Sequence, residues 1–276
     1  MISGTTRLAA VIGSPVRHSL SPALHNAGFT ATGLDWVYAA FEVAPGDAGK
    51  ALDAMRALGF GGLSVTMPHK ETVAALVDEL DPAASALRSV NTVVPLGDGR
   101  LKGFSTDGSG FVSSLAAQGV QLAGKRACVL GGGAAARAIV DAITRCGAAA
   151  VTVVNRSAER ARAAADLAGS IGVVGTPGDV ASCDVVINAT SVGMGTMDLP
   201  CDAGLLHAGQ VVADIVYHPR RTALLEAAEG AGARTIEGLG MLVHQALLQQ
   251  QLWTGITPDA TVMWAAAERE LASRGQ

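Results

Sequence analysis

Apolar and polar residues follow one another in blocks along this chain, and the blocks predict alternating strands and helices. Short apolar or alternating runs predict strands, and longer runs with apolar residues three or four positions apart predict helices. A strand–helix–strand rhythm is typical of a mostly parallel sheet with helices on both faces. In the first part of the chain we expect strands at 8–12, 36–43, 63–65 and 89–95, and helices at 22–32, 48–58 and 71–77.

A second series of the same kind follows a helix expected at 109–118. It contains predicted strands at 126–130, 151–154, 185–188, 211–215 and 234–236, with helices at 134–146 and 222–230. Two helices close the chain, an apolar one at 241–253 and an amphipathic one at 258–273, whose apolar face needs a partner surface. The chain therefore reads as an α/β protein with two sheets.

Composition narrows the class of protein. The chain has 276 residues, of which 49% are hydrophobic and 16% charged, so we expect a folded protein with a sizeable core. The formal net charge is −4 and no block of like charges occurs, which argues against nucleic-acid or membrane partners. The four cysteines lack the spacing of metal ligands, so we expect no metal site. We expect these cysteines to fill apolar space in a protein of a reducing compartment. The N-terminal run reads as a strand and not as a signal peptide, which favours a cytoplasmic location.

A glycine-rich turn between a strand and a helix predicts a dinucleotide site. Gly131, Gly132 and Gly133 lead into Ala134, Ala135 and Ala136, which gives the pattern G-x-G-x-x-A between strand 126–130 and helix 134–146. In that context the glycines permit a tight turn and the approach of a pyrophosphate to the backbone, and the small Ala136 lets the helix lie against the strand.

The end of the next strand favours NADP over NAD. An NAD site usually has an acidic residue there for the ribose 2′-hydroxyl, but here the chain reads Asn155, Arg156 and Ser157, with Arg160 one turn later. The two arginines can bind a 2′-phosphate by charge-assisted hydrogen bonds, although they could also be surface charges only.

Lys70 and Asp107 are the candidate acid–base residues. Lys70 follows a turn stiffened by Pro68 at the carboxyl end of a strand, which is where open α/β sheets bind ligands. A solvated lysine at the start of a helix is the alternative. Asp107 precedes helix 109–118, where it either caps that helix or faces Lys70 across a cleft.

Polar side chains near the other predicted strand ends could bind a ligand. Ser19 and Ser21 lie beside the N-terminus of helix 22–32 and could hold a carboxylate, although Ser21 followed by proline could be only an N-cap. Asn91 interrupts a β-branched strand and could bond a ligand hydroxyl or a neighbouring loop. Tyr217 and Gln245 could reach a polar ligand or belong to the core.

Histidine provides no metal site in this interpretation. His18 and His25 have no metal-ligand partners at suitable spacing, and we expect His25 on the surface of helix 22–32.

Taken together, these stretches resemble the shikimate dehydrogenase family over nearly the whole chain. Several motifs in one order are more specific than any one of them. They are residues 13–15 with 18–22, 64–70, 89–92, 105–108, the glycine turn, 155–157, 188–190 and 240–245.

The resemblance implies a fold and an activity. It implies an N-terminal, mostly parallel α/β domain for substrate (residues 1–106 plus 240–276), a Rossmann domain for NADP (residues 107–239), and a cleft between them that closes. It also implies reversible reduction of 3-dehydroshikimate to shikimate in aromatic amino-acid biosynthesis, by a monomer or homodimer. The last helix would return to the first domain.

The resemblance also assigns roles to residues. Lys70 and Asp107 match the polar pair at the reacting hydroxyl. Ser19 and Ser21 match serines on the substrate carboxylate, and Tyr217 matches a tyrosine beside them. Thr66, Asn91 and Gln245 match ring-hydroxyl ligands, and Ile215 and Gly238 match positions near the nicotinamide.

Ser64 and Ser105 stand where family members commonly have asparagine, which bears on the exact substrate. A quinate or aminoshikimate dehydrogenase is therefore an alternative, although Arg156 argues against an enzyme that prefers NAD. A methylenetetrahydrofolate dehydrogenase-like enzyme shares the two-domain plan, but the serine pair fits a small acid better than a pterin. A non-catalytic NADPH-binding sensor is the remaining alternative, which an intact Lys70 and Asp107 disfavour.

Overall fold

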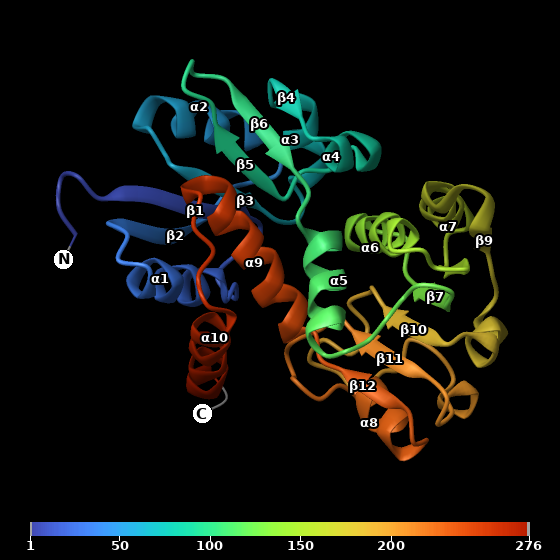
Figure 1. Ribbon diagram of the computed structural model, residues 1–276. Coiled ribbons are helices and arrows are strands. Elements are labelled where there is room, and N and C mark those ends of the chain that lie inside the picture. The colour runs from blue at the N-terminus through green and yellow to red at the C-terminus, as the bar shows by residue number, and fades with distance from the viewer. Residues whose placement is uncertain (1, 275–276) are drawn as a thin grey trace. The chain divides into compact units, whose positions relative to one another are not determined.

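The chain divides into two compact units in a computed structural model that describes residues 2–274 (Figure 1). Unit 1 contains Met1–Thr106 and Val243–Gln276, and unit 2 contains Asp107–Leu242. Helix α9 (Leu239–Thr254) begins in unit 2 and continues in unit 1, and the expected boundary at residue 240 lies in its first turn.

Unit 1 is built on a six-stranded sheet with the strand order β2-β1-β3-β5-β6-β4. Its strands are β1 (Arg7–Gly13), β2 (Trp36–Glu42), β3 (Gly62–Val65), β4 (Glu79–Leu80), β5 (Thr92–Pro95) and β6 (Leu101–Phe104). Its helices are α1 (Ser21–Ala31), α2 (Ala48–Leu58), α3 (Lys70–Leu76), α4 (Pro82–Leu87), α10 (Ala260–Arg274) and most of α9. The short β4, α4 and β6 were not expected from the sequence.

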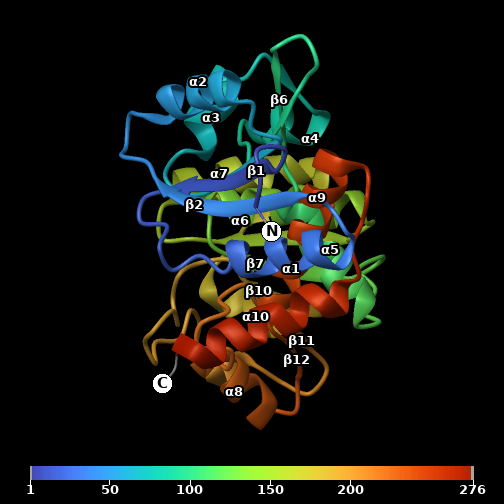
Figure 2. The same ribbon diagram turned by 90° about the vertical axis from the view of Figure 1, so that its left-hand side faces the viewer.

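Both faces of this sheet are buried, as the apolar strand β1 requires. Ala10 and Ile12 belong to the core on one face, and Ala9 and Val11 belong to the core on the other. Figure 2 shows α2 and α3 along one face and α1 and α10 along the opposite face. Helix α10 packs against α1, so the amphipathic last helix finds its partner surface within unit 1.

Glycine permits the close approach of α9 to this sheet. A Cβ atom at Gly62 would lie 2.4 Å from the Trp253 ring, so only glycine leaves room for that indole. Trp253 in turn donates its Nε1–H to the carbonyl of Val93, at 3.1 Å. The contact fixes α9 across β3 and β5.

One strand of this mostly parallel sheet, β5, runs against the others. β1 is parallel to β2 and β3, but β5 is antiparallel to both β3 and β6. Ser64 therefore lies opposite Thr92, and Thr92 lies opposite Phe104. The start of β5 and the end of β6 thus meet the carboxyl end of β3 at one edge of the sheet.

Unit 2 is a parallel six-stranded sheet with the order β12-β11-β10-β7-β8-β9, which is the Rossmann order. Its strands are β7 (Arg126–Leu130), β8 (Ala150–Val154), β9 (Gly172–Val174), β10 (Val185–Asn188), β11 (Val211–Asp214) and β12 (Arg234–Ile236). Its α-helices are α5 (Asp107–Ala117), α6 (Ala134–Arg145), α7 (Ala158–Ala165) and α8 (Ala223–Gly230). Short 3-10 segments η1, η2 and η3 lie at Asp166–Ile171, Pro177–Ser182 and Ala203–Leu205.

Small residues bring the helices of unit 2 close to their neighbours. A Cβ atom at Gly108 would lie 2.2 Å from the carbonyl oxygen of Ala138, so α5 can pack on α6 only with glycine at this position. Ala136 is fully buried and lets α6 lie against the sheet, as its place in the glycine motif predicts. No helix within residues 2–274 is long and apolar enough to span a membrane.

Candidate functional site

In unit 1, the polar candidates gather where β1, β3 and β6 end and β5 begins. The loops after β1 and β3 are bonded to each other, because Thr66 N–H donates to Ile12 O at 2.9 Å and Ser14 N–H donates to Met67 O at 2.9 Å. A Cβ atom at Gly13 would lie 2.4 Å from the Thr66 methyl group, so the two loops are in close contact. Thr66 is thereby held at the carboxyl edge of the sheet.

Lys70 is the first residue of α3, and main-chain hydrogen bonds fix its position. Val90 N–H donates to Lys70 O at 3.0 Å, which ties the start of α3 to the residue before Asn91. The buried His69 ring bonds the carbonyl of Val43 through Nε2 at 2.8 Å. The half-buried Lys70 side chain therefore projects from a rigid base.

Asn91 joins the starting end of β5 to the segment that leads into α5. Its Nδ2 donates to Thr106 Oγ1 at 2.9 Å, and its Oδ1 accepts from Thr106 N–H at 2.8 Å. Asn91 precedes β5 and does not interrupt it, in contrast to the sequence prediction. Asp107 follows Thr106 directly and is the first residue of α5, with only 9% of its surface exposed.

Ser19 and Ser21 lie at the start of α1, but Ser21 is not the N-cap that the sequence suggested. Leu20 occupies the N-cap position, and Ser21 is already helical. The Ser19 hydroxyl, one residue before that position, accepts from Ser21 N–H at 3.2 Å and so satisfies one of the otherwise unpaired donors of the first turn. Arg274 of α10 donates to the carbonyl oxygens of His18 at 2.5 Å and of Ser19 at 3.2 Å, which anchors this loop.

His25 lies in the core, and the expectation that it lies on the helix surface is wrong. It has no exposed surface, and its ring stacks on Tyr38 with centroids 4.3 Å apart. Its Nε2 bonds Gln249 Oε1 at 3.1 Å. Burial lowers the pKa of His25 from 6.5 to about 3, against the opposing effect of the Gln249 hydrogen bond.

This burial predicts a loss of stability in mild acid. The unfolded chain takes up a proton on His25 below pH 6.5 and the folded chain does not until about pH 3, so the free energy of unfolding falls between these values. We expect the wild type to lose about 2 kcal/mol of that free energy between pH 7 and pH 5 on account of this one group. Urea unfolding at both pH values, with His25→Phe as the comparison, measures it. Equal pH dependence in the two proteins would contradict the assignment.

In unit 2, the glycine turn has the form that a dinucleotide requires. Gly131 adopts φ 123°, and a Cβ atom there would lie 2.8 Å from the carbonyl oxygen of Ala189. A Cβ atom at Gly132 would lie 2.9 Å from the carbonyl oxygen of Arg160. Gly133 is the N-cap of α6 and offers no side chain, so the first N–H groups of α6, which include those of Ala134 and Ala135, suit an anion.

Arg156 and Arg160 lie beside this turn. Gly131 N–H donates to Val154 O at 2.8 Å, which brings the end of β8 next to the turn, and Asn155 and Arg156 follow directly. Ser157 caps α7 by accepting from Arg160 N–H at 3.3 Å. Both arginines are exposed, and no acidic residue stands between 155 and 158. The residues present therefore fit a dinucleotide that carries a 2′-phosphate.

Ile215 and Gly238 are in contact at the same edge of the second sheet. A Cβ atom at Gly238 would lie 2.6 Å from the carbonyl carbon and oxygen of Ile215. The segment after β11 is held by Asp214, whose carboxylate accepts from Asn188 Nδ2 at 2.9 Å and from Thr222 Oγ1 at 2.7 Å. Burial raises the pKa of Asp214, and these hydrogen bonds oppose that rise. This arrangement positions the half-buried Tyr217.

The candidates are thus divided between the units. Asp107, Tyr217 and all the dinucleotide candidates belong to unit 2. The other substrate candidates belong to unit 1, namely Ser19, Ser21, Thr66, Lys70, Asn91 and Gln245, the last being 8% exposed on α9.

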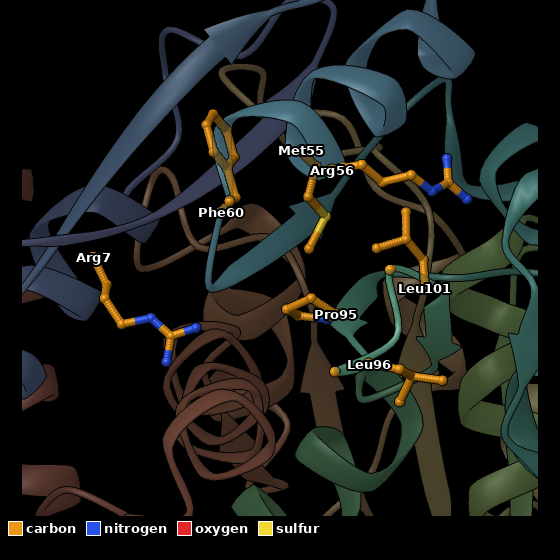
Figure 3. Close-up of a pocket in the computed structure, with 10 residues that line it drawn as sticks. Arg7, Met55, Arg56, Phe60, Pro95, Leu96 and Leu101 are labelled. Carbon is orange, nitrogen blue, oxygen red and sulfur yellow. The ribbon is translucent and has the colours of Figure 1, made fainter.

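A pocket of about 280 Å³ lies at the opposite edge of the first sheet, where β1 begins and β5 ends (Figure 3). The two arginines that line it interact with other residues of the protein, because the Arg7 guanidinium lies 4.7 Å from the centre of the Trp36 ring and Arg56 pairs with Asp78 at 2.9 Å. Figure 3 shows the two arginines on opposite sides of the pocket, so they do not converge on one ligand.

The cysteines differ in part from the prediction. Cys128 and Cys183 are buried and Cys201 is half-buried in one apolar cluster of unit 2, but Cys146 is exposed. Within residues 2–274, no group of three or more His, Cys, Asp or Glu side chains is arranged to hold a metal ion.

Three family models match successive parts of this chain. They are described as the shikimate dehydrogenase substrate-binding domain (residues 11–93), shikimate/quinate 5-dehydrogenase (residues 114–195) and the shikimate 5′-dehydrogenase C-terminal domain (residues 238–268). The first match covers Ser19, Ser21, Thr66, Lys70 and Asn91, and the second covers the glycine turn and Arg156.

Individual proteins match over nearly their whole length. Shikimate dehydrogenase (NADP+) of Moorella thermoacetica is 43% identical over 277 residues, covering 95% of this chain and 92% of the relative. A solved structure of shikimate dehydrogenase in complex with NADP+ superposes with a TM-score of 0.93 at 35% identity, covering 98% of each chain. Quinate dehydrogenase from Corynebacterium glutamicum in complex with NAD has a TM-score of 0.90 at 33% identity, covering 96% of this chain and 99% of that one.

Proposed function

This chain belongs to the shikimate dehydrogenase family, and we propose that it catalyses the reversible NADP-linked reduction of 3-dehydroshikimate to shikimate. The observation that carries the proposal is the convergence of Thr66, Asn91 and the base of Lys70 at one edge of the first sheet. A second sheet with a glycine turn and two exposed arginines supports the cofactor assignment.

We propose that unit 1 holds the cyclohexene acid. Ser19 and Ser21 at the N-terminus of α1 would bind its carboxylate, because hydroxyl donors and the positive end of a helix both favour an anion. Tyr217 would add a hydroxyl beside them. Thr66, Asn91 and Gln245 would bind the ring hydroxyls, because the amides of Asn91 and Gln245 are buried and the half-buried Thr66 is held in place, so a ring hydroxyl would complete their hydrogen bonds.

Lys70 and Asp107 would handle the proton. As the ketone is reduced, its oxygen gains charge, and an ammonium group close to that oxygen stabilises the charge and delivers a proton. Asp107 would orient the Lys70 side chain and accept from the substrate hydroxyl. Both residues stand at the first position of a helix, which gives each side chain a rigid base.

Residues of unit 2 would hold NADP. The turn at 131–135 would bind the pyrophosphate, Arg156 and Arg160 the 2′-phosphate with Asn155 and Ser157 beside it, and Ile215 and Gly238 would lie near the nicotinamide. When bound, NADP supplies the hydride acceptor for alcohol oxidation and the donor for the reverse reaction. A hydride passes only between atoms in contact, so the proposal requires the ring held by unit 1 to reach the nicotinamide held by unit 2.

Quinate is the alternative substrate that the comparisons with known proteins suggest. One matching family model is described as shikimate/quinate 5-dehydrogenase, and a quinate dehydrogenase shares the fold. That quinate dehydrogenase is bound to NAD, whereas Arg156, just after β8, favours NADP in this chain. Ser64, whose hydroxyl is bonded within the core, does not itself favour one cyclohexene acid over another.

The test is a comparison of initial rates. Shikimate, quinate and aminoshikimate are offered separately with NADP and with NAD to the purified protein. We expect shikimate with NADP to give the highest kcat/KM, by about tenfold or more, since a single missing hydrogen bond to a buried polar group costs about 1–3 kcal/mol. A higher kcat/KM with quinate would transfer the proposal to that substrate.

A further inference from the structure

A continuous chain of buried side chains crosses unit 1 behind the candidate substrate residues. All of its members are at most 8% exposed. The chain begins at Tyr38, whose Oη donates to Ser64 Oγ at 2.6 Å, and Ser64 Oγ donates to Gln249 Oε1 at 2.8 Å. Gln249 Nε2 then donates to Thr92 Oγ1 at 3.0 Å, and Thr92 Oγ1 donates to Asn91 Oδ1 at 2.8 Å. Finally, Asn91 Nδ2 donates to Thr106 Oγ1 at 2.9 Å. The chain thus ends at Asn91, one of the candidate substrate residues, and at its neighbour Thr106.

The donors in this chain all point the same way. Gln249 Oε1 can only accept, so Ser64 donates to it and accepts from Tyr38. Gln249 Nε2 can only donate, so the Thr92 oxygen accepts and its own proton goes to Asn91 Oδ1. Two donors, the Thr92 hydroxyl and the Thr106 main-chain N–H, therefore hold Asn91 Oδ1, and Asn91 Nδ2 points toward Thr106 Oγ1.

His25 fixes the orientation of the Gln249 amide. His25 Nδ1 faces the Nε2 of Gln250 at 3.2 Å, and an amide nitrogen can only donate, so Nδ1 accepts. The neutral ring must then carry its proton on Nε2, which donates to Gln249 Oε1. Because Gln249 Oε1 accepts from both Ser64 and His25, a flipped amide would lose both bonds.

Gln249 therefore stands at the centre of the network and makes four hydrogen bonds. Besides Ser64, His25 and Thr92, it donates to the carbonyl oxygen of Asn91 at 3.3 Å. It lies one helical turn after Gln245 on α9, so the two amides share one face of that helix. These four bonds use both amide protons and both lone pairs of the Gln249 side chain, so it has none left for a ligand.

We propose that Gln249 is a positioning residue for substrate, which holds the Asn91 amide through Thr92, together with the Thr106 N–H, and so determines how Asn91 meets a ring hydroxyl. This inference rests on the proposed function. Its effect belongs to unit 1 alone and leaves the dinucleotide candidates of unit 2 unaffected.

The test compares two adjacent glutamines. Gln249→Met keeps the side-chain volume but breaks the chain. Gln250→Met is the matched control, since Gln250 is equally buried and its loss removes a bond to His25 Nδ1 but none of the four bonds of Gln249. We expect both variants to lower the melting temperature. Gln249→Met should raise KM for shikimate about 5- to 10-fold, which corresponds to about one hydrogen bond, with kcat and the KM for NADP within about twofold of wild type. Gln250→Met should change each KM less than about twofold.

Equal KM values for shikimate in the two variants would overturn the inference, because Gln249 would then contribute only to the stability of the fold. If Gln249→Met does not fold, Thr92→Val breaks the next link at nearly constant volume and should raise KM for shikimate in the same way. If the wild type does not oxidise shikimate, the proposed function fails, and the inference is judged by NMR. The Asn91 side-chain amide resonances should then shift in Gln249→Met and stay in place in Gln250→Met. Unchanged resonances in both would overturn it.

Discussion

Replacement of Lys70 by alanine is expected to lower the turnover number for shikimate by a factor of about 100 or more, because a positioned acid–base group contributes about 10² to 10⁴ to such a reaction. The main chain of Lys70 is bonded to Val90, so truncation of the side chain leaves the site otherwise in place. The KM for shikimate should change far less, because Ser19, Ser21 and Asn91 remain. Steady-state kinetics with both substrates saturating measures the effect.

A surface lysine gives the matched control for this variant. Lys50 lies in the first turn of α2 with 82% of its side chain exposed, and it pairs with Asp47 at 2.8 Å. Lys50→Ala should keep the wild-type turnover number. If Lys70→Ala instead raises KM and keeps turnover, Lys70 contributes only to uniform binding of the substrate, and the proton-transfer role is wrong.

Replacement of Arg156 by alanine is expected to remove most of the preference for NADP. One charge-assisted hydrogen bond contributes about 1.5–3 kcal/mol, so kcat/KM for NADP should fall by about 10- to 100-fold. The rate with NAD should stay nearly unchanged, because NAD offers no 2′-phosphate for the guanidinium to bind. The ratio of kcat/KM for the two dinucleotides, measured in both proteins, gives the result directly.

Arg162 supplies the control for that experiment. It is also exposed on α7, but it lies in the last turn of the helix and not beside the glycine turn. Arg162→Ala should leave the ratio as in the wild type. Equal use of NADP and NAD by the wild type would refute the assignment of the 2′-phosphate site.

Periodicity and turn residues were sufficient to predict most elements of both sheets. The expected bounds at 48–58, 126–130, 185–188 and 234–236 coincide with those of α2, β7, β10 and β12. The same signals do not reveal β4, which is only two residues long, or the antiparallel direction of β5. The direction of a strand depends on its pairing with distant segments, so it cannot be predicted from a single run of apolar residues.

The sequence correctly predicted the local setting of two candidates, because the glycine turn lies between β7 and α6 and Lys70 begins α3 just after the turn that follows β3. The sequence prediction failed for His25 because its partners come from far along the chain. Gln249 is 224 residues away, and α9 and α10 cover the side of α1 that would otherwise face water. A possible signal was the run of three glutamines at 249–251 within an apolar helix, since buried amides need partners.

The most direct test of the central claim is a single product analysis. The purified protein is incubated with shikimate and NADP, and both products are quantified over time. We expect NADPH and 3-dehydroshikimate to form mole for mole, and the reaction to run backwards when 3-dehydroshikimate and NADPH are supplied. A protein that binds NADP but forms neither product from shikimate, under conditions where it is folded, would contradict the proposal.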